Sequence, residues 1–493
     1  MAETVKSLSE LGLRAQGGRE ARITGLSVDS RQVKPGHLFA ALPGTRMHGG
    51  EFIRYALRME AAAILTDREG AAIAAAELAA SGAALIVVED PRQVLAYTAA
   101  LWFGRQPDTV VAVTGTSGKT SVASFTRQIW QALGHQAANL GTMGVLGDFT
   151  APLAHTTPEP ITLHRVLRDM AEAGITHAAM EASSHGLDQG RLDGVRLKAA
   201  AFTNFSQDHL DYHAGFDEYF AAKAGLFARV LPDDGTAVIN IDDPRGREML
   251  AIARGRGQRL LTVGRDPAAD LRITAQRFDA TGQDLRFTHE GRPHLVRLAL
   301  IGGFQAENVL AAAGLAMAAG DAPEAVVAAL HGLTTVRGRM ELAAKRDNGA
   351  TVFVDYSHKP GALASALQSL RPHVLGRIVV VFGAGGDRDR LKRPLMGEVA
   401  ARYADVVIVT DDNPRSEDPA AIRAEVMAGC PEATEVADRA EAILRGVDAL
   451  GPGDALLVAG KGHETGQIVG NDIYPFDDAE QASVAVAALE GRI

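Results

Sequence analysis

The sequence predicts an α/β protein in which parallel sheets are covered by helices. Two series of short apolar segments lead to this prediction, because each segment is followed by a stretch with helical periodicity. The first series begins at residue 109 and the second at residue 351. The composition agrees, since 46% of the 493 residues are apolar and 22% are charged, as in an ordinary globular chain.

Three domains are expected along the chain. Residues 1–106 alternate short apolar runs with alanine-rich helical stretches, and this N-terminal α/β module ends near Pro107. Residues 107–335 form a central domain, and residues 336–493 form a C-terminal, Rossmann-like domain. The length of the chain suits this division, since each part can bury its own core.

Individual elements follow from the patterns within these domains. In the central domain the strand-like segments are 177–183, 198–205 and 235–242. The stretch 270–300 alternates in the manner of a smaller antiparallel sheet, a helix is expected at 306–319, and 333–339 is a linker. Each strand of the second series leads into a polar loop that contains glycine, and ligands bind at such strand ends in open α/β sheets.

The bulk properties exclude several classes of protein. A net charge of −10 without a basic block argues against a nucleic-acid binder. Cys430 is the only cysteine, so neither a disulfide framework nor a thiolate metal site is available, and it is expected to be buried. The N-terminus lacks the apolar core of a signal peptide, and no apolar run is long enough to cross a membrane. We expect a cytoplasmic protein that binds neither nucleic acid nor a membrane.

The segment TVVAVTGTSGKTS at 109–121 predicts a nucleotide site. A β-branched run breaks at Gly115, and helical spacing follows Lys119 and Thr120, so backbone N–H groups and a helix N-terminus can cradle phosphates. Lys119 would reach the outer phosphates of ATP, and the Thr120 hydroxyl would hold Mg²⁺. The predicted loop residues are Gly115, Thr116, Ser117, Gly118, Lys119, Thr120 and Ser121.

The glycine motifs by themselves are ambiguous. Val113 replaces the first glycine of the full phosphate-loop pattern, and a bare Gly-Lys-Thr also occurs at ordinary strand–helix junctions. The segments GAGGDR at 383–388 and GKGHETG at 460–466 lack the third glycine of a dinucleotide fingerprint at its required position. A Rossmann NAD site is therefore not expected.

Polar residues follow two further strands. MEASSHGLDQGRL at 180–192 is either a helix start capped by Ser184 or, as we favour, a loop that faces a ligand. In TNFSQDHLDYH at 203–213, His209 and His213 have the spacing of a metal pair, which is as often structural. Glu181 with Thr120 is the better Mg²⁺ site, because this ion prefers oxygen ligands. The residues alone indicate that the lysine in EYFAAKAGLF, Lys223, is an exposed helical lysine.

Together these segments resemble the Mur ligases, the ATP-dependent amide-forming enzymes of peptidoglycan precursor synthesis. The resemblance covers nearly the whole chain and is closest to the branch of the family that adds diaminopimelate. Its main motifs are VDSRQVKPGHLFAAL (28–42), TGTSGKTS (114–121), HTTPEP (155–160), MEASSHGL (180–187), TNFSQDHLDYH (203–213), VRGRMEL (336–342), VDYSHKPGAL (354–363), GAGGDRDRLKRPLM (383–396), DDNPRSEDP (411–419) and AGKGHE (459–464).

The resemblance implies a division of labour among the domains. The N-terminal domain would bind UDP, the central one ATP, and the C-terminal one the amino acid. Residues expected to contact the substrate UDP-MurNAc-L-Ala-D-Glu are Val28, Ser30, Thr45, Arg46, Met47, Thr156, Thr157, Ser183, Gln189 and Arg191. Arg191 suits this role, because its planar guanidinium can donate to phosphate or carboxylate oxygens.

The resemblance also reverses the expectation for Lys223. In the family this lysine is carbamylated by CO₂ and becomes a carboxylate-like Mg²⁺ ligand, and a small apolar helix face (Ala221, Ala222 and Ala224) is expected to keep its amine neutral enough to react. Two Mg²⁺ ions would be held by Thr120, Glu181, His209 and the Lys223 carbamate. For ATP, Asn308 and Arg339 match adenine- and ribose-side positions, and Asp355 and His358 match a pair near the nucleotide.

The chemistry implied by the resemblance begins at the D-glutamate γ-carboxylate, which attacks the γ-phosphate of ATP to give an acyl phosphate. The amine of the incoming amino acid then displaces phosphate. Lys119 and the metal ions stabilise the meeting of two anions. No protein nucleophile is needed, in keeping with the lack of a catalytic cysteine or an activated serine.

The expected amino-acid specificity rests on Arg415. Diaminopimelate is lysine with a second carboxylate on its far carbon, which a bidentate arginine can read. The other residues that match this pocket are Arg388, Asp412, Asn413, Pro414, Gly460 and Glu464. Ser357, Lys359 and the Thr465-Gly466 pair depart from the family pattern, and we expect none of them to touch a residue with an assigned role.

Three alternatives remain at this point. The first is a sibling ligase that adds L-lysine or D-Ala-D-Ala, against which Arg415 and the Asp29-Ser30-Arg31 segment argue. The second is a P-loop kinase or NTPase, which would not need the loops after residues 383, 411 and 459. The third is a catalytically idle nucleotide-sugar sensor, which the intact Lys119, Thr120 and Lys223 disfavour. We expect a monomer.

Overall fold

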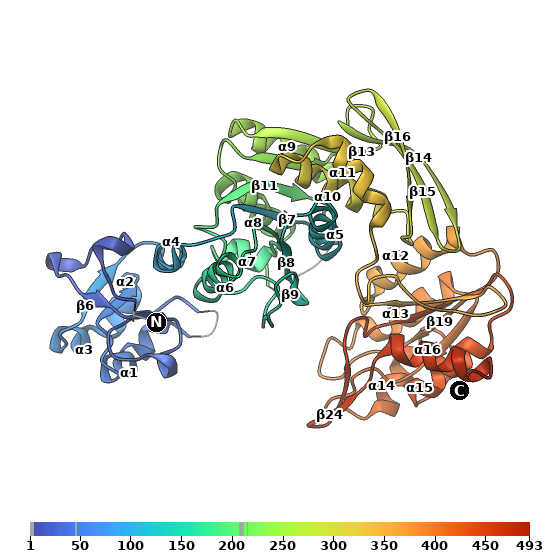
Figure 1. The fold of residues 1–493 in the computed structure, drawn as a ribbon. Helices are drawn as coiled ribbons and strands as arrows, with labels where there is room; N and C mark the ends of the chain where they lie inside the picture. Colours follow the sequence, from blue (N-terminus) through green and yellow to red (C-terminus); the bar gives the residue numbers. More distant parts are fainter. Residues whose placement is uncertain (1–3, 45–46, 207–211, 214) are drawn as a thin grey trace. The chain divides into compact units, whose positions relative to one another are not determined.

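The computed structural model describes residues 4–44, 47–206, 212–213 and 215–493. The chain divides into two compact units. Unit 1 consists of residues 1–263 and 314–322, and unit 2 of residues 264–313 and 323–493. Figure 1 shows the elements of both units in sequence colours.

The N-terminal part of unit 1 is a parallel sheet with short helices. Its strands pair in the order β3 (Gly25–Ser27), β4 (His37–Ala40), β5 (Ala63–Thr66) and β6 (Ala84–Val87), and β1 (Lys6–Ser7) pairs with β2 (Arg22–Ile23). The helices are α1 (Ile53–Arg58), α2 (Arg68–Ile73), α3 (Ala75–Ala80) and α4 (Pro91–Phe103). Asp67 and Asp90 cap α2 and α4, so local sequence fixes where these helices begin.

The second part of unit 1 contains the strand predicted before the glycine loop and those predicted at 177–183, 198–205 and 235–242, together with three strands that were not predicted, at 137–141, 144–147 and 259–264. The seven strands form part of one sheet. They pair in the order β13 (Arg259–Gly264), β12 (Thr236–Asn240), β11 (Leu197–Phe202), β7 (Thr109–Thr114), β10 (His177–Glu181), β8 (Ala137–Gly141) and β9 (Gly144–Gly147). All neighbours are parallel except β8 and β9. The helices are α5 (Lys119–Ala132), α6 (Pro160–Glu172), α7 (Ser184–Asp188), α8 (Phe216–Gly225), which continues as a π-helical turn (Leu226–Val230), and α9 (Pro244–Gly255).

The register of this sheet brings several predicted residues to one edge. Val113 of β7 lies opposite Glu181 of β10, and Thr114 lies opposite Phe202 of β11. Because the strands are parallel, the segments that begin at Gly115, Ala182 and Thr203 all leave the sheet on the same side. The candidate site of unit 1 is built at this edge.

Unit 2 begins with an antiparallel meander and ends with a parallel sheet. The meander consists of β14 (Leu271–Asp279), β15 (Gly282–His289) and β16 (Arg292–Leu298), and α10 (Gln305–Ala319) and α11 (Pro323–Ala329) follow it in the chain. The sheet has the order β17 (Glu341–Lys345), β18 (Thr351–Asp355), β22 (Ala455–Ala459), β19 (Ile378–Phe382), β20 (Val406–Val409) and β21 (Thr434–Glu435). A hairpin of β23 (Gly466–Val469) and β24 (Asp472–Pro475) follows β22 in sequence.

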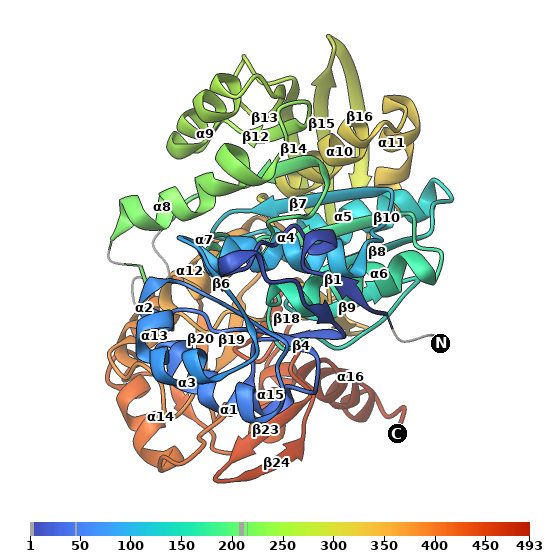
Figure 2. The same ribbon diagram turned by 90° about the vertical axis from the view of Figure 1, so that its left-hand side faces the viewer.

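Helices cover both faces of the unit 2 sheet. Phe353 packs with α12 (Pro360–Leu370), α13 (Lys392–Tyr403) and α14 (Pro419–Met427) on one face. Its neighbours Val352 and Val354 pack with α15 (Arg439–Asp448) and α16 (Asp478–Leu489) on the other. These last two helices lie side by side in Figure 1 and Figure 2. Alternate side chains therefore enter two cores, as expected for a doubly covered parallel sheet.

These observations confirm the predicted α/β class, the antiparallel stretch at 270–300 and the helix expected at 306–319. Cys430 is buried as predicted. The boundaries of the three predicted domains stay predictions. Within the described ranges, no helix combines the length and the apolar character needed to span a bilayer.

Candidate active site

The predicted phosphate-binding loop lies between β7 and α5. Because β7 is fully buried and α5 begins at Lys119, the N–H groups of the first helical turn stand at the end of the loop. Gly115 and Gly118 adopt φ angles of 149° and 87°, which L-residues rarely adopt. The Lys119 Nζ donates to the carbonyl oxygens of Gly115 at 2.9 Å and Thr116 at 3.0 Å. The Lys119 ammonium group is therefore bonded to the backbone of the loop itself.

The segment after β11 holds this loop in place. Thr203 Oγ1 donates to the carbonyl oxygen of Ser117 at 2.6 Å, and the Ser117 N–H donates to Asn204 Oδ1 at 2.9 Å. The Thr116 N–H donates to the carbonyl oxygen of Asn204 at 2.9 Å. A Cβ on Gly115 would lie 1.9 Å from Thr203 Oγ1, so glycine is required there. Thr203 and Asn204 were not among the predicted site residues. Their position could have indicated a role, because they are a polar pair directly after a buried strand.

Glu181 ends β10 and is 1% exposed. Its Oε2 accepts a hydrogen bond from Thr120 Oγ1 at 3.0 Å, and its Oε1 accepts one from the Thr142 N–H at 2.9 Å. A Cβ on Gly141 would lie 1.9 Å from Glu181 Oε1, so the carboxylate fills the space that a side chain would need. The structure thus brings together the two oxygen ligands that the sequence predicted for Mg²⁺. Sequence reasoning missed Thr142, which follows the neighbouring strand β8.

Lys223 is not the exposed helical lysine that the residues alone indicated. It lies on α8, is 1% exposed, and donates from Nζ to the carbonyl oxygen of Gly115 at 2.8 Å. The Nζ also lies 4.5 Å from the centroid of the Tyr219 ring, and the Tyr219 hydroxyl lies 3.2 Å from Thr116 Oγ1. Tyr219 is one helical turn away and shares the face of Lys223. The predicted alanine face is wrong in part, since Ala221 is exposed.

Three predicted residues, Thr45, Arg46 and His209, lie outside the described residues. His213 is described and is buried, with its ring centroid 5.2 Å from that of Tyr219. Its Nε2 is a buried atom without a hydrogen-bond partner among the described residues. Nor do the described His, Cys, Asp and Glu side chains form a cluster of three or more that could hold a metal ion.

A second polar cluster surrounds Thr157. Its hydroxyl donates to the carbonyl oxygen of Glu181 at 3.0 Å and accepts from Ser183 Oγ at 3.0 Å. Arg191 donates from Nη1 to the Thr157 carbonyl at 2.6 Å and from Nη2 to Gln189 Oε1 at 2.8 Å. Burial lowers the pKa of the Arg191 guanidinium. Four of the residues predicted to contact the substrate, Thr157, Ser183, Gln189 and Arg191, are therefore in one hydrogen-bonded network.

Two other predictions for this region have different outcomes. Ser183 is the N-cap of α7, accepting from the Gly186 N–H at 3.1 Å, whereas the sequence analysis had named Ser184 as the possible cap. The Thr156 hydroxyl lies 3.1 Å from the hydroxyl of Thr142, and the Thr142 N–H donates to Glu181 Oε1. Thr156 is therefore connected to the other residues through Thr142 and Glu181.

The predicted uridine-binding residues of the N-terminal part are on the surface. Val28 is 36% exposed and Met47 is 58% exposed, and Ser30 begins a short 3₁₀ turn that Asp29 caps.

In unit 2, the residues predicted near ATP cluster around Asp355 at the end of β18. Asp355 is buried, which raises the pKa of its carboxyl group, and its Oδ2 accepts from the Met340 N–H at 2.8 Å. Burial lowers the pKa of His358, whose Nδ1 lies 2.8 Å from the carbonyl oxygen of Tyr356. The Arg339 guanidinium lies 4.8 Å from the centroid of the Tyr356 ring.

Asn308, which was predicted together with Arg339 for the adenine and ribose sides of ATP, is buried on α10, and its Nδ2 donates to Gln305 Oε1 at 3.1 Å. That bond fixes the orientation of the Asn308 side chain within its own helix.

The expectation that Ser357 touches no residue with an assigned role is wrong. Its Oγ donates a short hydrogen bond to Asp355 Oδ1, and this bond opposes the rise in the pKa of that carboxyl. The sequence does not reveal this contact, because it depends on how the chain turns after β18. Ser357 is the second residue after Asp355, and its side chain turns back toward the carboxylate that ends the strand.

The predicted amino-acid residues come together at the carboxyl ends of β19, β20 and β22. Asn413 is buried, and its Nδ2 donates to Glu464 Oε2 at 2.9 Å. The fully buried Lys461 donates to Asn413 Oδ1 at 3.0 Å and lies 3.5 Å from Glu464 Oε2, and burial lowers its pKa. A Cβ on Gly460 would lie 2.5 Å from Asp412 Oδ2. Lys461 belongs to the AGKGHE motif, but it was not among the residues predicted for this pocket.

Arg415 extends toward the loop after β19. Its Nη1 donates to the carbonyl oxygen of Gly386 at 2.8 Å, and a Cβ on Gly386 would lie 1.9 Å from the carbonyl oxygen of Pro414. The glycines of GAGGDR thus serve the close approach of two loops. Arg388 is exposed, and its Nη1 donates to the carbonyl oxygen of Asp387 at 3.1 Å.

A buried ion pair supports these loops from behind. Arg439 and Asp478 are both fully buried, and they are joined by two hydrogen bonds of 2.7 Å. Arg439 Nη2 also donates to the carbonyl oxygen of Ala459 at 3.0 Å, and its Nη1 to that of Asp411 at 3.3 Å. Each of these carbonyls directly precedes a predicted pocket residue, Gly460 and Asp412.

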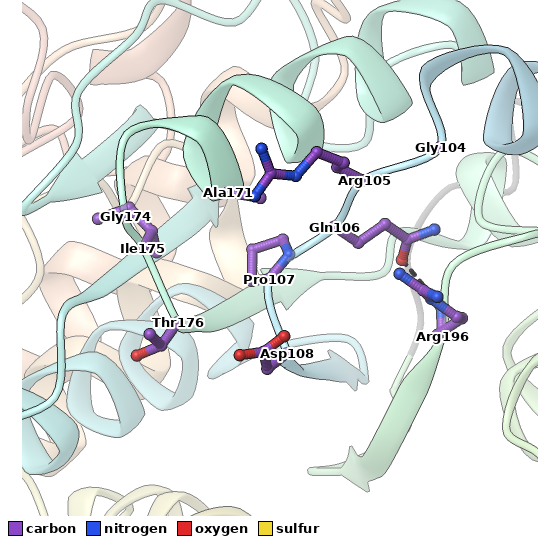
Figure 3. Close-up of a pocket in the computed structure, with 10 residues that line it drawn as sticks. All are labelled: Gly104, Arg105, Gln106, Pro107, Asp108, Ala171, Gly174, Ile175, Thr176 and Arg196. Carbon is purple, nitrogen blue, oxygen red and sulfur yellow. Dashed lines mark hydrogen bonds between the residues drawn. The ribbon is translucent and has the colours of Figure 1, made fainter.

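A surface pocket of about 280 Å³ in unit 1 contains none of the predicted site residues. Its lining residues are Gly104, Arg105, Gln106, Pro107, Asp108, Ala171, Gly174, Ile175, Thr176 and Arg196 (Figure 3). In this pocket the Arg196 N–H donates to Gln106 Oε1 at 3.1 Å.

A glycine loop that leads from a buried parallel strand into a helix at Lys119, with Thr120 bonded to an acidic residue, defines a P-loop nucleotide-binding α/β protein. Three family profiles match successive parts of the chain. "Mur ligase family, catalytic domain" matches residues 22–102, "Mur ligase middle domain" matches 113–316, and "Mur ligase, glutamate ligase domain" matches 338–462.

Similarity to individual proteins extends over nearly the whole chain. Two relatives named UDP-N-acetylmuramoyl-L-alanyl-D-glutamate–2,6-diaminopimelate ligase, from Bradyrhizobium diazoefficiens and Brucella melitensis biotype 1, are 50% and 51% identical. The alignments cover 94% and 95% of this chain and 95% of each relative. A solved structure of a ligase with this name has a TM-score of 0.74 at 33% identity and covers 99% of this chain and 100% of its own. The chain belongs to the Mur ligase family.

Proposed function

We propose that this chain is an ATP-dependent amide ligase that joins meso-diaminopimelate to UDP-N-acetylmuramoyl-L-alanyl-D-glutamate, with release of ADP and phosphate, in peptidoglycan precursor synthesis. The observation that carries the proposal is 50% identity, over 94% of the chain, to a ligase named for this reaction. The residues predicted for the amino acid agree with it, because Arg415, Asn413 and Glu464 come from loops of one strand-end cluster.

The first chemical step joins two anions, the γ-carboxylate of D-glutamate and the γ-phosphate of ATP. The carboxylate oxygen attacks phosphorus, the bond to the β-phosphate oxygen breaks, and an acyl phosphate and ADP result. Lys119 supports this step, since its ammonium lies on the loop that would cradle the phosphates and would lower their mutual repulsion. The partly buried Thr157–Ser183–Arg191 network is suited to hold the anionic substrate.

The donor set fits a magnesium ion. Thr120 Oγ1 and Glu181 Oε2 lie 3.0 Å apart, and both are oxygens of the kind that this ion prefers. We infer that Thr120 and Glu181, with Lys223 in its carbamylated form and His209, would hold the metal. The ion, when bound, would supply positive charge that stabilises phosphoryl transfer. Burial of Lys223 beside the carbonyl of Gly115 agrees with a role in the site, because an unused ammonium is rarely buried.

In the second step the neutral amine of diaminopimelate attacks the acyl carbon, phosphate leaves with the bonding electron pair, and the nitrogen releases one proton to solvent. Arg415 would accept the second carboxylate of diaminopimelate in a bidentate pair, and Glu464 would face its far ammonium. With lysine in the pocket, Arg415 would face a methylene end with no charge to pair. We therefore infer selection of diaminopimelate over lysine.

The remaining parts of the proposal follow from the same assignment. The domains are those at 1–106, 107–335 and 336–493. Val28, Ser30, Thr45, Arg46 and Met47 would contact the uridine diphosphate, and Asn308, Arg339, Asp355 and His358 the nucleoside and phosphates of ATP. We infer a cytoplasmic enzyme that acts as a monomer.

The decisive assay measures phosphate release from ATP in the presence of UDP-MurNAc-L-Ala-D-Glu. Either meso-diaminopimelate or L-lysine is added, and wild type is compared with Arg415→Ala. Release with diaminopimelate only, and its loss in the variant, is the expected result. Equal phosphate release with lysine would overturn the assignment of Arg415. Phosphate release that does not depend on either amino acid would indicate a simple NTPase instead of a ligase.

A further inference from the structure

Two non-glycine residues beside the candidate amino-acid pocket have positive φ angles. Arg415 and Asp387 adopt φ angles of 51° and 53°, in the left-handed region that favours glycine. Such conformations persist where surrounding contacts hold them, and they gather at binding sites. The contacts that hold these two residues are therefore informative.

The backbone of Arg415 is held from one side by the β23 strand and the turn after it. The Arg415 N–H donates to the carbonyl oxygen of Ile468 at 3.0 Å, and the Gly470 N–H donates to the carbonyl oxygen of Arg415 at 2.7 Å. These bonds fix where the arginine leaves the loop. They do not fix the direction of its side chain.

The loop after β19 supplies the contacts on the other side. Asp387 accepts from Ser416 Oγ at 2.6 Å and from the Ser416 N–H at 3.2 Å, while Arg415 Nη1 donates to the carbonyl of Gly386 at 2.8 Å. Consecutive residues of one loop, 386 and 387, thus bind consecutive residues of the other, 415 and 416. The two hydrogen bonds from Ser416 keep the pKa of Asp387 below its ordinary value, as expected for a carboxylate that acts as their acceptor.

Asp387 is itself anchored to a buried group. Its N–H donates to Glu417 Oε1 at 2.5 Å, and Glu417 is bound by the fully buried Arg393, which also donates to the carbonyl oxygen of Gly385 at 3.2 Å. The carboxylate that receives Ser416 therefore projects from a loop whose backbone is fixed on both sides of it. This arrangement is expected of a residue that holds a neighbouring loop in place. Asp387 is exposed and contributes nothing to a core, so packing does not explain it.

We propose that Asp387 and Ser416 are positioning residues that direct the Arg415 guanidinium toward the second carboxylate of diaminopimelate. This inference rests on the proposed function. Bidentate recognition needs both N–H groups aligned with both oxygens, so a guanidinium free to turn loses affinity and specificity. Neither Asp387 nor Ser416 needs to touch the substrate, and both act through Arg415.

The test uses four variants of the full-length enzyme: Asp387→Ala, Asp387→Gly, Asp387→Asn and Ser416→Ala. The KM for diaminopimelate is expected to rise about fivefold to tenfold in Asp387→Ala and Ser416→Ala, because a charge-assisted hydrogen bond is lost. The KM for ATP is expected to stay unchanged, and the preference for diaminopimelate over lysine should fall by a similar factor. The double variant Asp387→Ala/Ser416→Ala should be no worse than Asp387→Ala alone, because Asp387→Ala already removes the acceptor of both hydrogen bonds, whereas Ser416→Ala removes only the one from Oγ.

The other two variants separate the carboxylate from the backbone. Asp387→Gly accepts the φ of 53° without strain but lacks the oxygens, so it should behave like Asp387→Ala. Asp387→Asn keeps an acceptor and tolerates this φ, so it should recover most of the wild-type KM. Normal kinetics in Asp387→Gly would overturn the proposal and assign the effect to backbone strain.

Controls separate this inference from folding and from the proposed function. Glu398→Ala removes an exposed carboxylate from α13 in the same unit and should change neither the KM nor the melting temperature. A KM for diaminopimelate that is unchanged in Asp387→Ala, in an enzyme that selects diaminopimelate, would overturn the inference alone. A wild type that forms no amide with diaminopimelate would instead overturn the proposed function.

Discussion

Replacing Gly141 by alanine would test the candidate metal site without changing any charged group. A Cβ at this position would lie 1.9 Å from Oε1, 2.5 Å from Cδ and 2.7 Å from Cγ of Glu181. These atoms belong to the buried carboxylate that binds Thr120 and Thr142, and the φ of Gly141 is not in the left-handed region. The strain is therefore steric alone, and it displaces the Glu181 side chain.

The magnitude follows from the bonds that are displaced. Glu181 is 1% exposed and accepts from Thr142 N–H at 2.9 Å and Thr120 Oγ1 at 3.0 Å. Hydrogen bonds to a charged group contribute roughly 1.5–3 kcal/mol each, so losing one or both costs about 1.5 to 6 kcal/mol. Since a domain is stable by only about 5–15 kcal/mol, the variant should unfold at clearly lower temperature or denaturant concentration.

The assay combines urea unfolding, followed in wild type and Gly141→Ala, with ATP-dependent phosphate release at varied Mg²⁺. The matched control is Gly255→Ala on α9, where a Cβ meets no atom within 4 Å and should be neutral or slightly stabilising. The variant is expected to be less stable than wild type and to need more Mg²⁺ for half-maximal turnover. A Gly141→Ala enzyme with the stability and Mg²⁺ dependence of Gly255→Ala would refute the reasoning.

Three further predictions concern other parts of the molecule. Ser357→Ala removes a donor that lowers the pKa of the buried Asp355 carboxyl, so the acidic limb of the pH–rate profile should move to higher pH, and an unmoved limb would contradict a role for that carboxylate. The hydrogen bond from Arg393 lowers the pKa of Glu417 to about 2, so this contribution to stability is present above pH 4.5 and is lost as the pH falls toward 2. The difference in unfolding free energy between wild type and Glu417→Gln should shrink over that window, and a constant difference would count against the ion pair. Lys223→Arg should remain folded but lose about tenfold to a hundredfold of turnover, as for other residues that support a metal site. Wild-type turnover should fall on removal of CO₂ and return with bicarbonate, whereas insensitivity to both would exclude the carbamate.

The parts of the site that lie within one strand, turn and helix could be predicted from the sequence. The loop at 115–121 is an example, because its β-branched strand, its glycines and its Lys-Thr pair are all local signals. Glu181 could be chosen from the ligand preference of Mg²⁺, since it ends a strand of the same series. Such features need only the period of the pattern and the chemistry of the side chains.

The rest depends on contacts between distant segments, which no local pattern carries. The helix of Lys223 has no clear apolar stripe, so nothing in EYFAAKAGLF indicates that this lysine turns inward to a carbonyl more than a hundred residues away. Asn204 binds the phosphate loop only because β11 and β7 are neighbours in the sheet. The wrong prediction for Ser357 has a different cause. Ser357 departs from a family motif, and such a departure was expected to change only the shape of the loop, whereas its hydroxyl contacts Asp355.

The buried pair of Arg439 and Asp478 has an evolutionary consequence. An exchange at either position alone would leave a charge in the core without a partner, at a cost of about 3–5 kcal/mol, and would release the carbonyls of Ala459 and Asp411. Descendants of this sequence should therefore keep both residues or replace both together. A mutant library that aims to change the amino-acid preference has to keep these two positions fixed or vary them together, although neither side chain would contact the new substrate.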